Sequence, residues 1–272
     1  KTIDDYHADI DELRRSADQL QDGSYMSEEI YIEIQELEEK IKSMENYTCI
    51  NLCSDFKPMK GPEIPHNFIK FSAGELHIQI GEIDSSRCCN SLTITSRVSS
   101  SDDIMKIMLA ANALKAEGFD CISLFIPYLP YSRQDRICSP GQAFSLKVFA
   151  DMINSCGFAG VFTIDPHSSA SSSLIKGLHE FDYTYLMSAV VKDRNKYMHI
   201  VQPDKGAVLR VGGVWFALDG VEDIIKCDKV RDPKTGKLSG FKVLNPEDIK
   251  GKDCVIYDDI CDGGGTFLGI AE

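Results

Sequence analysis

Hydrophobic positions in residues 1–46 recur at alternating intervals of three and four residues. The first series is Ile3, Tyr6, Ile10, Leu13, Ala17 and Leu20, and the second is Ile30, Ile34, Leu37, Ile41 and Met44. This spacing gathers the apolar side chains into one narrow stripe along a helix. Asp22-Gly23-Ser24 separates the two series, and Ser27 with the two glutamates after it is typical of a helix start. Residues 1–46 are therefore predicted to form an antiparallel helical hairpin, whose stripe serves packing or oligomerisation.

From residue 47 the pattern changes to short apolar runs separated by helical or polar segments. Strands are predicted over residues 48–53, 76–80, 92–95, 121–127, 161–165, 199–203, 223–227 and 254–257, and helices over 101–117 and 142–156. Gly118 fits the end of the first of these helices. Apolar strands that alternate with helices are typical of an α/β fold with mainly parallel sheets. Such sheets bind ligands at the carboxyl ends of their strands, so the polar segments there are the candidate sites.

Composition and charge exclude several classes of function. The chain has 272 residues, of which 43% are hydrophobic and 26% charged, as expected for about two globular domains. No apolar run approaches the ~20 residues that cross a bilayer, and no secretory signal is recognisable. The ten cysteines include no CxxC pair, which indicates reduced thiols in a cytoplasmic protein. The net charge is −13, of which residues 1–46 carry −9, and no basic stripe predicts nucleic-acid binding.

Two polar motifs follow the strands predicted at 121–127 and 161–165. In Tyr131-Ser-Arg-Gln-Asp-Arg136, two arginines flank a Gln-Asp pair, and arginine binds phosphate oxygens through two parallel hydrogen bonds. The alternative is an internal Arg–Asp ion pair. In Asp165-Pro-His167, a carboxylate and an imidazole two residues apart can share a divalent cation or its water shell. The alternative is a histidine with a purely structural role.

Residues 228–240 form a third polar segment, which contains Lys229 and Arg231. Its thirteen residues include two glycines, one proline and few apolar anchors. This composition predicts a mobile basic loop of the kind that closes over phosphate groups. The alternative is a solvated hairpin.

Residues 255–266, VIYDDICDGGGT, combine two adjacent acids with a glycine loop. Asp258 and Asp259 follow a predicted strand, where they can accept hydrogen bonds from the 2- and 3-hydroxyls of a ribose. Backbone N–H groups of a glycine loop that enters a helix can bind a phosphate. The pattern is neither a Walker A loop, because no lysine follows the glycines, nor GxGxxG. It therefore predicts a phosphoribosyl site, with an ordinary turn as the alternative.

These motifs together resemble those of the ribose-phosphate diphosphokinases, or PRPP synthases, over residues 66–272. The matches are FSAGE at 71–75 for the family's FSDGE, YSRQDR at 131–136 for YARQDR, TIDPH at 163–167 for LDLH, QPDKG at 202–206 for SPDxG, DKVR at 228–231 for DKRR, and YDDICDGGGT at 257–266 for VDDxxDTAGT. Six motifs in one order resemble the family far more specifically than any one of them does.

The resemblance implies an α/β fold of two phosphoribosyltransferase-type domains, residues 47–184 and 185–272, after the hairpin of residues 1–46. The family's second domain runs on past its phosphate loop, so residues 185–272 are expected to hold only part of it. The family assembles as homodimers or hexamers. Its reaction is the Mg²⁺-dependent transfer of the β,γ-diphosphate of ATP to the anomeric hydroxyl of ribose 5-phosphate. The products are AMP and PRPP, an activated sugar for nucleotide or NAD synthesis.

The resemblance also implies roles for single residues. By that likeness ATP is bound by Phe71, Glu75, Arg133, Gln134 and Arg136, and Mg²⁺ is bound by His167 and Asp204. The catalytic residues are His167, Lys229 and Arg231, the last two by stabilising the transferring group. The ribose hydroxyls are bound by Asp258 and Asp259, and the 5-phosphate by Asp262, Gly263, Gly264, Gly265 and Thr266.

Three departures from the family's motifs bear on specificity. Ala73 replaces an acid or amide that reads adenine, and residues 137–141 replace a basic run that binds regulatory phosphate. In the phosphate loop, Gly263 and Gly264 replace a threonine and an alanine, which removes a hydroxyl and opens space. The open loop favours, as an alternative acceptor, a 5′-substituted ribose such as ADP-ribose.

Two other classes of protein are alternatives to a diphosphokinase. A non-catalytic regulatory homologue would not need to retain His167, Lys229 and Arg231. A phosphoribosyltransferase shares the loop at 258–266 but would not need the RQDR and DKVR segments.

Overall fold

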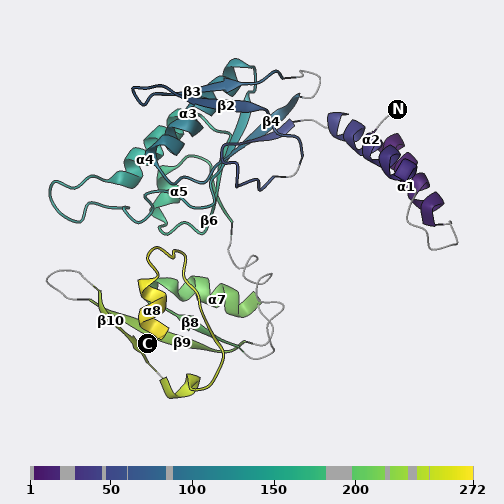
Figure 1. The fold of residues 1–272 in the computed structure, drawn as a ribbon. Helices are drawn as coiled ribbons and strands as arrows, with labels where there is room; N and C mark the ends of the chain where they lie inside the picture. The colour runs from purple at the N-terminus through teal and green to yellow at the C-terminus, as the bar shows by residue number, and fades with distance from the viewer. Residues whose placement is uncertain are drawn as a thin grey trace. The chain divides into compact units, whose positions relative to one another are not determined.

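The computed structural model describes residues 3–18, 28–44, 47–59, 61–83, 88–181, 198–217, 221–231, 238–244 and 246–271 (Figure 1). Contacts divide the chain into two compact units, one of Lys1–Thr163 with Ala170–His179, the other of Ile164–Ser169 with Glu180–Glu272. The domain boundaries inferred from the sequence stay a prediction. None of the helices in the described stretches is long and apolar enough to cross a membrane.

Two helices in contact, α1 (Ile3–Asp18) and α2 (Glu28–Met44), confirm the predicted N-terminal helix pair. Ile10 and Ile34, one from each apolar series, are buried in the same cluster at 4% exposure each. The side chains around them are Tyr6, Leu13, Ile30 and Leu37. The predicted break at residues 22–24 and the Ser27 cap lie outside the described residues.

The first unit is built on a five-stranded sheet in the order β1-β4-β5-β6-β7. Its strands are β1 (Tyr47–Asn51), β4 (Cys88–Thr95), β5 (Cys121–Phe125), β6 (Gly160–Ile164) and β7 (Leu178–Phe181), and its helices are α3 (Ser101–Ala116), α4 (Ser145–Ser155) and α5 (Ala170–Leu174). The pairs β1–β4, β4–β5 and β5–β6 are parallel, as the alternation of strands and helices predicts. The antiparallel strands β2 (His66–Lys70) and β3 (Leu76–Ile80) form a separate hairpin.

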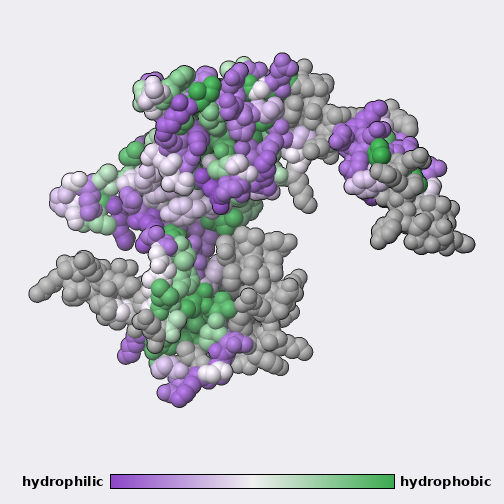
Figure 2. All heavy atoms as spheres, in the orientation of Figure 1, coloured by the Kyte–Doolittle hydropathy of each residue, from purple (hydrophilic) through white to green (hydrophobic). Residues whose placement is uncertain are grey.

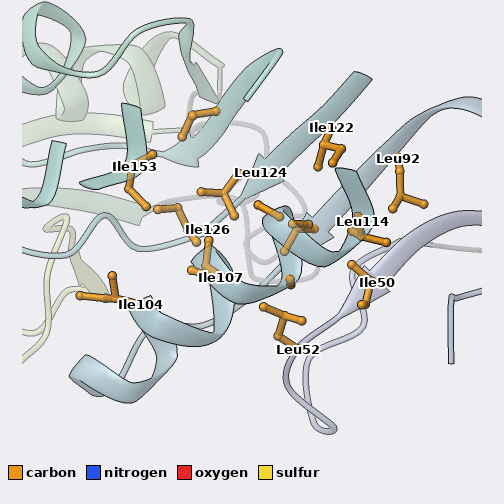
Figure 3. Packing of buried hydrophobic residues seen from close by; sticks show 14 of the residues in the cluster. Ile50, Leu52, Leu92, Ile104, Ile107, Leu114, Ile122, Leu124, Ile126 and Ile153 are labelled. Atoms are coloured by element: carbon orange, nitrogen blue, oxygen red, sulfur yellow. The ribbon is translucent and has the colours of Figure 1, made fainter. Parts of the chain in front are cut away.

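The core of the first unit lies between this sheet and its helices (Figure 3). Leu124 and Ile126 come from β5 and the residue that follows it, Ile107 comes from α3, and all three are fully buried. Successive side chains of a strand point to opposite faces, and in β5 the buried Ile122 and Leu124 alternate with more exposed residues, so one face of this strand supplies most of its core packing.

Helix α3 begins at a buried carboxylate. Asp103 Oδ2 accepts hydrogen bonds from the backbone N–H and the hydroxyl of both Ser99 and Ser100, at 2.9–3.0 Å, and Asp103 Oδ1 accepts one from Lys106 Nζ at 3.0 Å. Burial alone would raise the pKa of Asp103, but the hydrogen bonds from Lys106, Ser99 and Ser100 outweigh it and hold that pKa well below its usual range. The helix ends at Ala116, and Gly118, just after the Glu117 cap, has a φ of 91°, which is costly for other residues.

The second unit is a four-stranded sheet in the order β10-β9-β8-β11. Its elements are β8 (Met198–Gln202), the short 3₁₀ turn η2 (Lys205–Ala207), α7 (Val208–Ala217), β9 (Val221–Arg231), β10 (Leu238–Val243), the turn η3 (Pro246–Ile249), β11 (Cys254–Ile256) and α8 (Gly265–Ala271). β8 pairs in parallel with β9 and β11, whereas β9 and β10 are antiparallel.

Helices lie on both faces of this sheet. Ile200 of β8 packs with Ala207, Val211 of α7 and Tyr257, whereas its neighbour Val201 packs with Ile225 of β9 and Ile270 of α8. This alternation is the two-residue period of a strand buried on both sides. Figure 2 shows apolar atoms gathered on the face of the second unit where Figure 1 places α8.

We predict that Asp103→Asn lowers the free energy of unfolding by about 1–3 kcal/mol, because it weakens the helix cap and the charged hydrogen bond to Lys106. The matched control is Asp102→Asn, which removes an exposed ion pair to Lys70 at 2.5 Å and the other acid of the first turn, and should cost less than about 1 kcal/mol.

Because the folded-state pKa of Asp103 is lowered, its contribution is present above the unfolded value of about 4 and is lost as pH falls toward the folded value. Denaturant unfolding at neutral pH and below about pH 4 measures both effects. The role given to Asp103 would be contradicted if both variants lost the same free energy of unfolding. It would also be contradicted if the difference between them did not change with pH.

Candidate functional site

Two predicted ATP-binding residues lie at the tip of the hairpin between β2 and β3. Phe71 and Glu75 bracket the turn, where the Phe71 N–H donates to the Glu75 carbonyl at 2.9 Å and the Gly74 N–H donates to the Phe71 carbonyl at 2.8 Å. Gly74 has a φ of 92°, which this tight turn requires. The Phe71 ring is 53% exposed and tilted against His77. The turn therefore presents an exposed aromatic face of the kind that stacks on a base.

The other predicted ATP-binding residues, Arg133, Gln134 and Arg136, lie on the segment between β5 and α4. Tyr131, just before them, has a φ of 62°, and its ring packs on Phe149 of α4 at 5.9 Å. The Gln134 N–H donates to the Tyr131 carbonyl at 2.8 Å, and the Gln134 carbonyl accepts from the Leu146 N–H at 3.2 Å. A left-handed tyrosine is strained, so packing on α4 must hold it there. This anchor fixes the backbone that carries the two arginines.

The contact between Arg136 and Asp135, one form of the ion pair weighed against phosphate binding, is weak. Arg136 Nε lies 3.8 Å from Asp135 Oδ1, and the Arg136 side chain is 79% exposed. An exposed pair at this distance contributes little, so the guanidinium of Arg136 remains accessible to an anion.

In the second unit, the register of the sheet gathers the predicted site residues at one edge. Ile256 at the end of β11 pairs with Val201 near the end of β8, and both strands run in the same direction. Asp204 follows β8 and Asp258 follows β11, so the two acids leave the sheet at the same edge. Sequence reasoning expected ligand residues at such carboxyl ends.

The basic segment at 228–231 is part of a strand, which corrects the expectation of a loop over residues 228–240. β8 ends at Gln202 opposite Lys226, but β9 continues to Arg231 and pairs there with β10. The backbone of Lys229 pairs with Phe241, and that of Arg231 with Leu238. These described residues form the hairpin weighed as the alternative, and residues 232–237 lie outside the description. Because β9 continues past the residue that pairs with the end of β8, the backbones of Lys229 and Arg231 extend beyond the edge where β8 ends.

Asp204 caps the turn η2. Its Oδ1 accepts hydrogen bonds from the Gly206 N–H at 2.8 Å and the Ala207 N–H at 3.2 Å. A Cβ at position 206 would lie 3.1 Å from this oxygen, so glycine permits the close approach. One carboxylate oxygen is therefore fixed by the backbone, and this fixes the direction of the side chain.

The glycine loop before α8 is sterically open. A Cβ added at Gly263, Gly264 or Gly265 would meet no atom within 4 Å. Only Gly264 has a left-handed backbone, with a φ of 72°. The replacement at 263 therefore leaves space that a side chain could occupy.

The structure brings together two predicted site residues that lie 92 positions apart. His167 Nδ1 is 2.6 Å from Asp259 Oδ2, and both residues belong to the second unit. The Asp259 side chain is 5% exposed and that of His167 43%. Asp165, two residues earlier, has a φ of 41°, and its N–H donates to the Phe181 carbonyl at 3.2 Å. Nothing in the local sequence pattern predicts this pair.

The described donors suit a cation that brings its own ligands. Among the described residues, no three His, Cys, Asp or Glu side chains lie close enough together to hold a metal ion. Mg²⁺ commonly binds one or two carboxylates, several waters and the phosphates of a substrate rather than a closed protein cage. Asp204, with one oxygen fixed by the backbone, and the exposed ring of His167 fit that mode of binding.

Comparison with known proteins identifies the family. Residues 33–157 match the N-terminal domain of ribose phosphate pyrophosphokinase, and residues 177–272 match the phosphoribosyl transferase domain. The chain belongs to the ribose-phosphate pyrophosphokinase family. The family likeness inferred from six motifs is thereby confirmed, as is the fold of two phosphoribosyltransferase-type domains.

Relatives within the pyrophosphokinase family are distant. The ribose-phosphate pyrophosphokinase of Marinomonas sp. (strain MWYL1) is 32% identical over 211 residues, which cover 75% of this chain and 64% of that protein. The one from Agrobacterium fabrum is 32% identical over 178 residues, covering 63% and 54%. The chain thus spans less than two thirds of the length of these relatives. The crystal structure of phosphoribosylpyrophosphate synthetase from Mycobacterium smegmatis, at 21% identity, shares the fold with a TM-score of 0.67 over 83% of this chain and 75% of that one.

We predict that Gly264→Ala lowers the free energy of unfolding of this pyrophosphokinase homologue by about 1–2 kcal/mol, because alanine is strained at positive φ. Gly263→Ala is the matched control, since its backbone is unstrained and its Cβ would meet open space. Chemical denaturation of both variants measures the difference. Equal stability of the two variants would show that the loop does not hold position 264 in this conformation.

Proposed function

We propose that this chain transfers the β,γ-diphosphate of Mg-ATP to the anomeric hydroxyl of ribose 5-phosphate, producing PRPP and AMP. The observation that carries the proposal is the register of the second sheet, which ends β8 and β11 at one edge and extends the basic end of β9 beyond it. Asp258, proposed for the sugar, and Asp204, proposed for Mg²⁺, therefore follow strands that end at the same edge of the sheet. The basic residues proposed for phosphate lie on the strand that extends past this edge. Diphosphoryl transfer needs positioning and charge neutralisation more than a covalent nucleophile.

Each group has a proposed task. Phe71 and Glu75 hold the adenine, and Arg133, Gln134 and Arg136 hold the nucleotide phosphates. Asp204 and His167 hold Mg²⁺, which when bound neutralises phosphate charge. Lys229 and Arg231 stabilise the transferring diphosphate, Asp258 orients the ribose, and residues 262–266 hold the 5-phosphate. The proposed assembly is a homodimer or hexamer.

A second acceptor has a specific observation in its favour. A Cβ added at Gly263 or Gly265 would meet no atom within 4 Å, so the loop has room for a substituent on the 5-phosphate. A threonine hydroxyl at 263 would add a hydrogen bond to a charged oxygen, worth about 1.5–3 kcal/mol. Its absence weakens ribose 5-phosphate but admits a substituted phosphate, as in ADP-ribose. The product would then be ADP-ribose pyrophosphate, a precursor for NAD synthesis.

Release of AMP from Mg-ATP, measured as kcat/KM with each sugar, tests the function and the acceptor together. We expect AMP release with ribose 5-phosphate, and Gly263→Thr should raise kcat/KM for ribose 5-phosphate relative to ADP-ribose by about tenfold or more. No AMP with either sugar would support the non-catalytic alternative. An unchanged preference in Gly263→Thr would contradict the open-loop argument.

We also predict that Lys229→Ala and Arg231→Ala each lower kcat by about 10²–10³, because each removes a positive charge proposed to stabilise the transition state, while ATP affinity changes by only a few fold. Lys242→Ala is the control, because this exposed lysine lies on β10 of the same hairpin, opposite Asp228. Steady-state assays of AMP release measure kcat, and titration of each variant with ATP measures its ATP affinity. Near-normal turnover in both variants would remove Lys229 and Arg231 from the catalytic residues.

A further inference from the structure

The two adjacent acids at 258 and 259 lie in different surroundings. Asp259 has a side chain that is only 5% exposed, and its Oδ2 is 2.6 Å from His167 Nδ1. Asp258 is partly exposed, and its Oδ1 accepts a hydrogen bond from the Asp259 N–H at 3.1 Å. The two carboxylates are therefore not equivalent, although the sequence alone suggested that both take ribose hydroxyls.

A carboxylate as buried as that of Asp259 needs a compensating partner. Burying an ionised carboxylate without a hydrogen-bond donor is costly, and the imidazole N–H of His167 is such a donor. A sugar hydroxyl can bind only carboxylate oxygens that it can reach. The oxygen of Asp259 that faces His167 is already engaged, which leaves Asp258 as the accessible acid.

The same contact fixes the histidine. When Nδ1–H donates to a carboxylate, the ring is held in one orientation and one tautomer, and Nε2 keeps its lone pair. His167 also lies on a constrained backbone, because Pro166 precedes it and Asp165 has a left-handed φ of 41°. Since 43% of the His167 side chain is exposed, the ring has an accessible side away from the buried carboxylate.

We propose that Asp259 is a positioning residue that acts through His167, and that Asp258 supplies the carboxylate for the ribose diol. Asp259 accepts a hydrogen bond from His167 Nδ1–H and thereby holds the ring in the tautomer whose Nε2 carries the lone pair that can bind a cation. The task of Asp258 rests on the proposed function, whereas the pairing of Asp259 with His167 rests on the contact alone.

The first experiment examines the protein without substrate. NMR of ¹⁵N-histidine-labelled protein at about pH 8.5, where an ordinary imidazole is neutral, distinguishes the two tautomers of each of the six histidines. The signal that disappears in His167→Gln identifies His167. We expect the Nδ1-protonated tautomer in the wild type and in Asp258→Asn, and its loss in Asp259→Asn. An Nε2-protonated His167 in the wild type would overturn the pairing even if Asp259→Asn did not fold.

The second experiment measures ribose 5-phosphate binding without ATP, by calorimetry. Asp258→Asn should weaken binding by about 10- to 100-fold, the cost of losing a hydrogen bond to a charged group. Asp259→Asn should bind within about threefold of the wild type. If Asp259→Asn weakens binding as much as Asp258→Asn, then Asp259 is a sugar ligand and the proposal is wrong.

Turnover supplies the remaining readout. Asp259→Asn and His167→Gln should each lower kcat, and the double variant should be no slower than the slower single variant, because the two residues act as one unit. Additive losses would overturn the positioning role. If the wild type neither binds the sugar nor releases AMP, the proposed function fails, but the tautomer measurement still decides the pairing.

Discussion

Parallel pairing of β8 with β9 and β11 is the constraint on which the candidate site of the second unit depends. Parallel strands end at the same edge, so Asp204 and Asp258, which are distant in sequence, leave the sheet side by side in its topology. The greater length of β9 then carries basic residues beyond that edge. Helices on both faces require the alternation of apolar side chains seen in β8, where Ile200 and Val201 join different clusters.

Buried charge imposes a second requirement at this edge. Asp259 lies where a lone carboxylate would be destabilising, and His167 approaches it from the turn after β6. In the first unit, Asp103 follows the same rule with serine and lysine donors at the start of α3. In both cases the hydrogen-bond donors hold the carboxylate in place, and the carboxylate in turn fixes the orientation of the donor side chains. For His167 this link joins two motifs that the sequence presents as separate.

Much of the fold follows from periodicity, but some elements carry no such signal. The apolar series of residues 1–46 identified the pair Ile10 and Ile34, and Gly118 marked the end of α3, because both effects are local. The strand β10 was missed, since Gly240 interrupts it and its register with β9 is irregular. The short strands β2 and β7 were missed as well, because they alternate weakly and are only partly buried. The contact between His167 and Asp259 spans 92 residues and depends on tertiary packing, which no local pattern encodes.

The proposed function rests on one chemical event, the transfer of two phosphoryl groups as a unit. ³¹P NMR of a mixture of this protein, Mg-ATP and ribose 5-phosphate or ADP-ribose observes that transfer directly. The expected spectrum shows AMP appearing together with a diphosphate attached to the anomeric oxygen of the sugar, in equal amounts. Formation of ADP with a singly phosphorylated sugar, or of ADP and free phosphate, would contradict the claim.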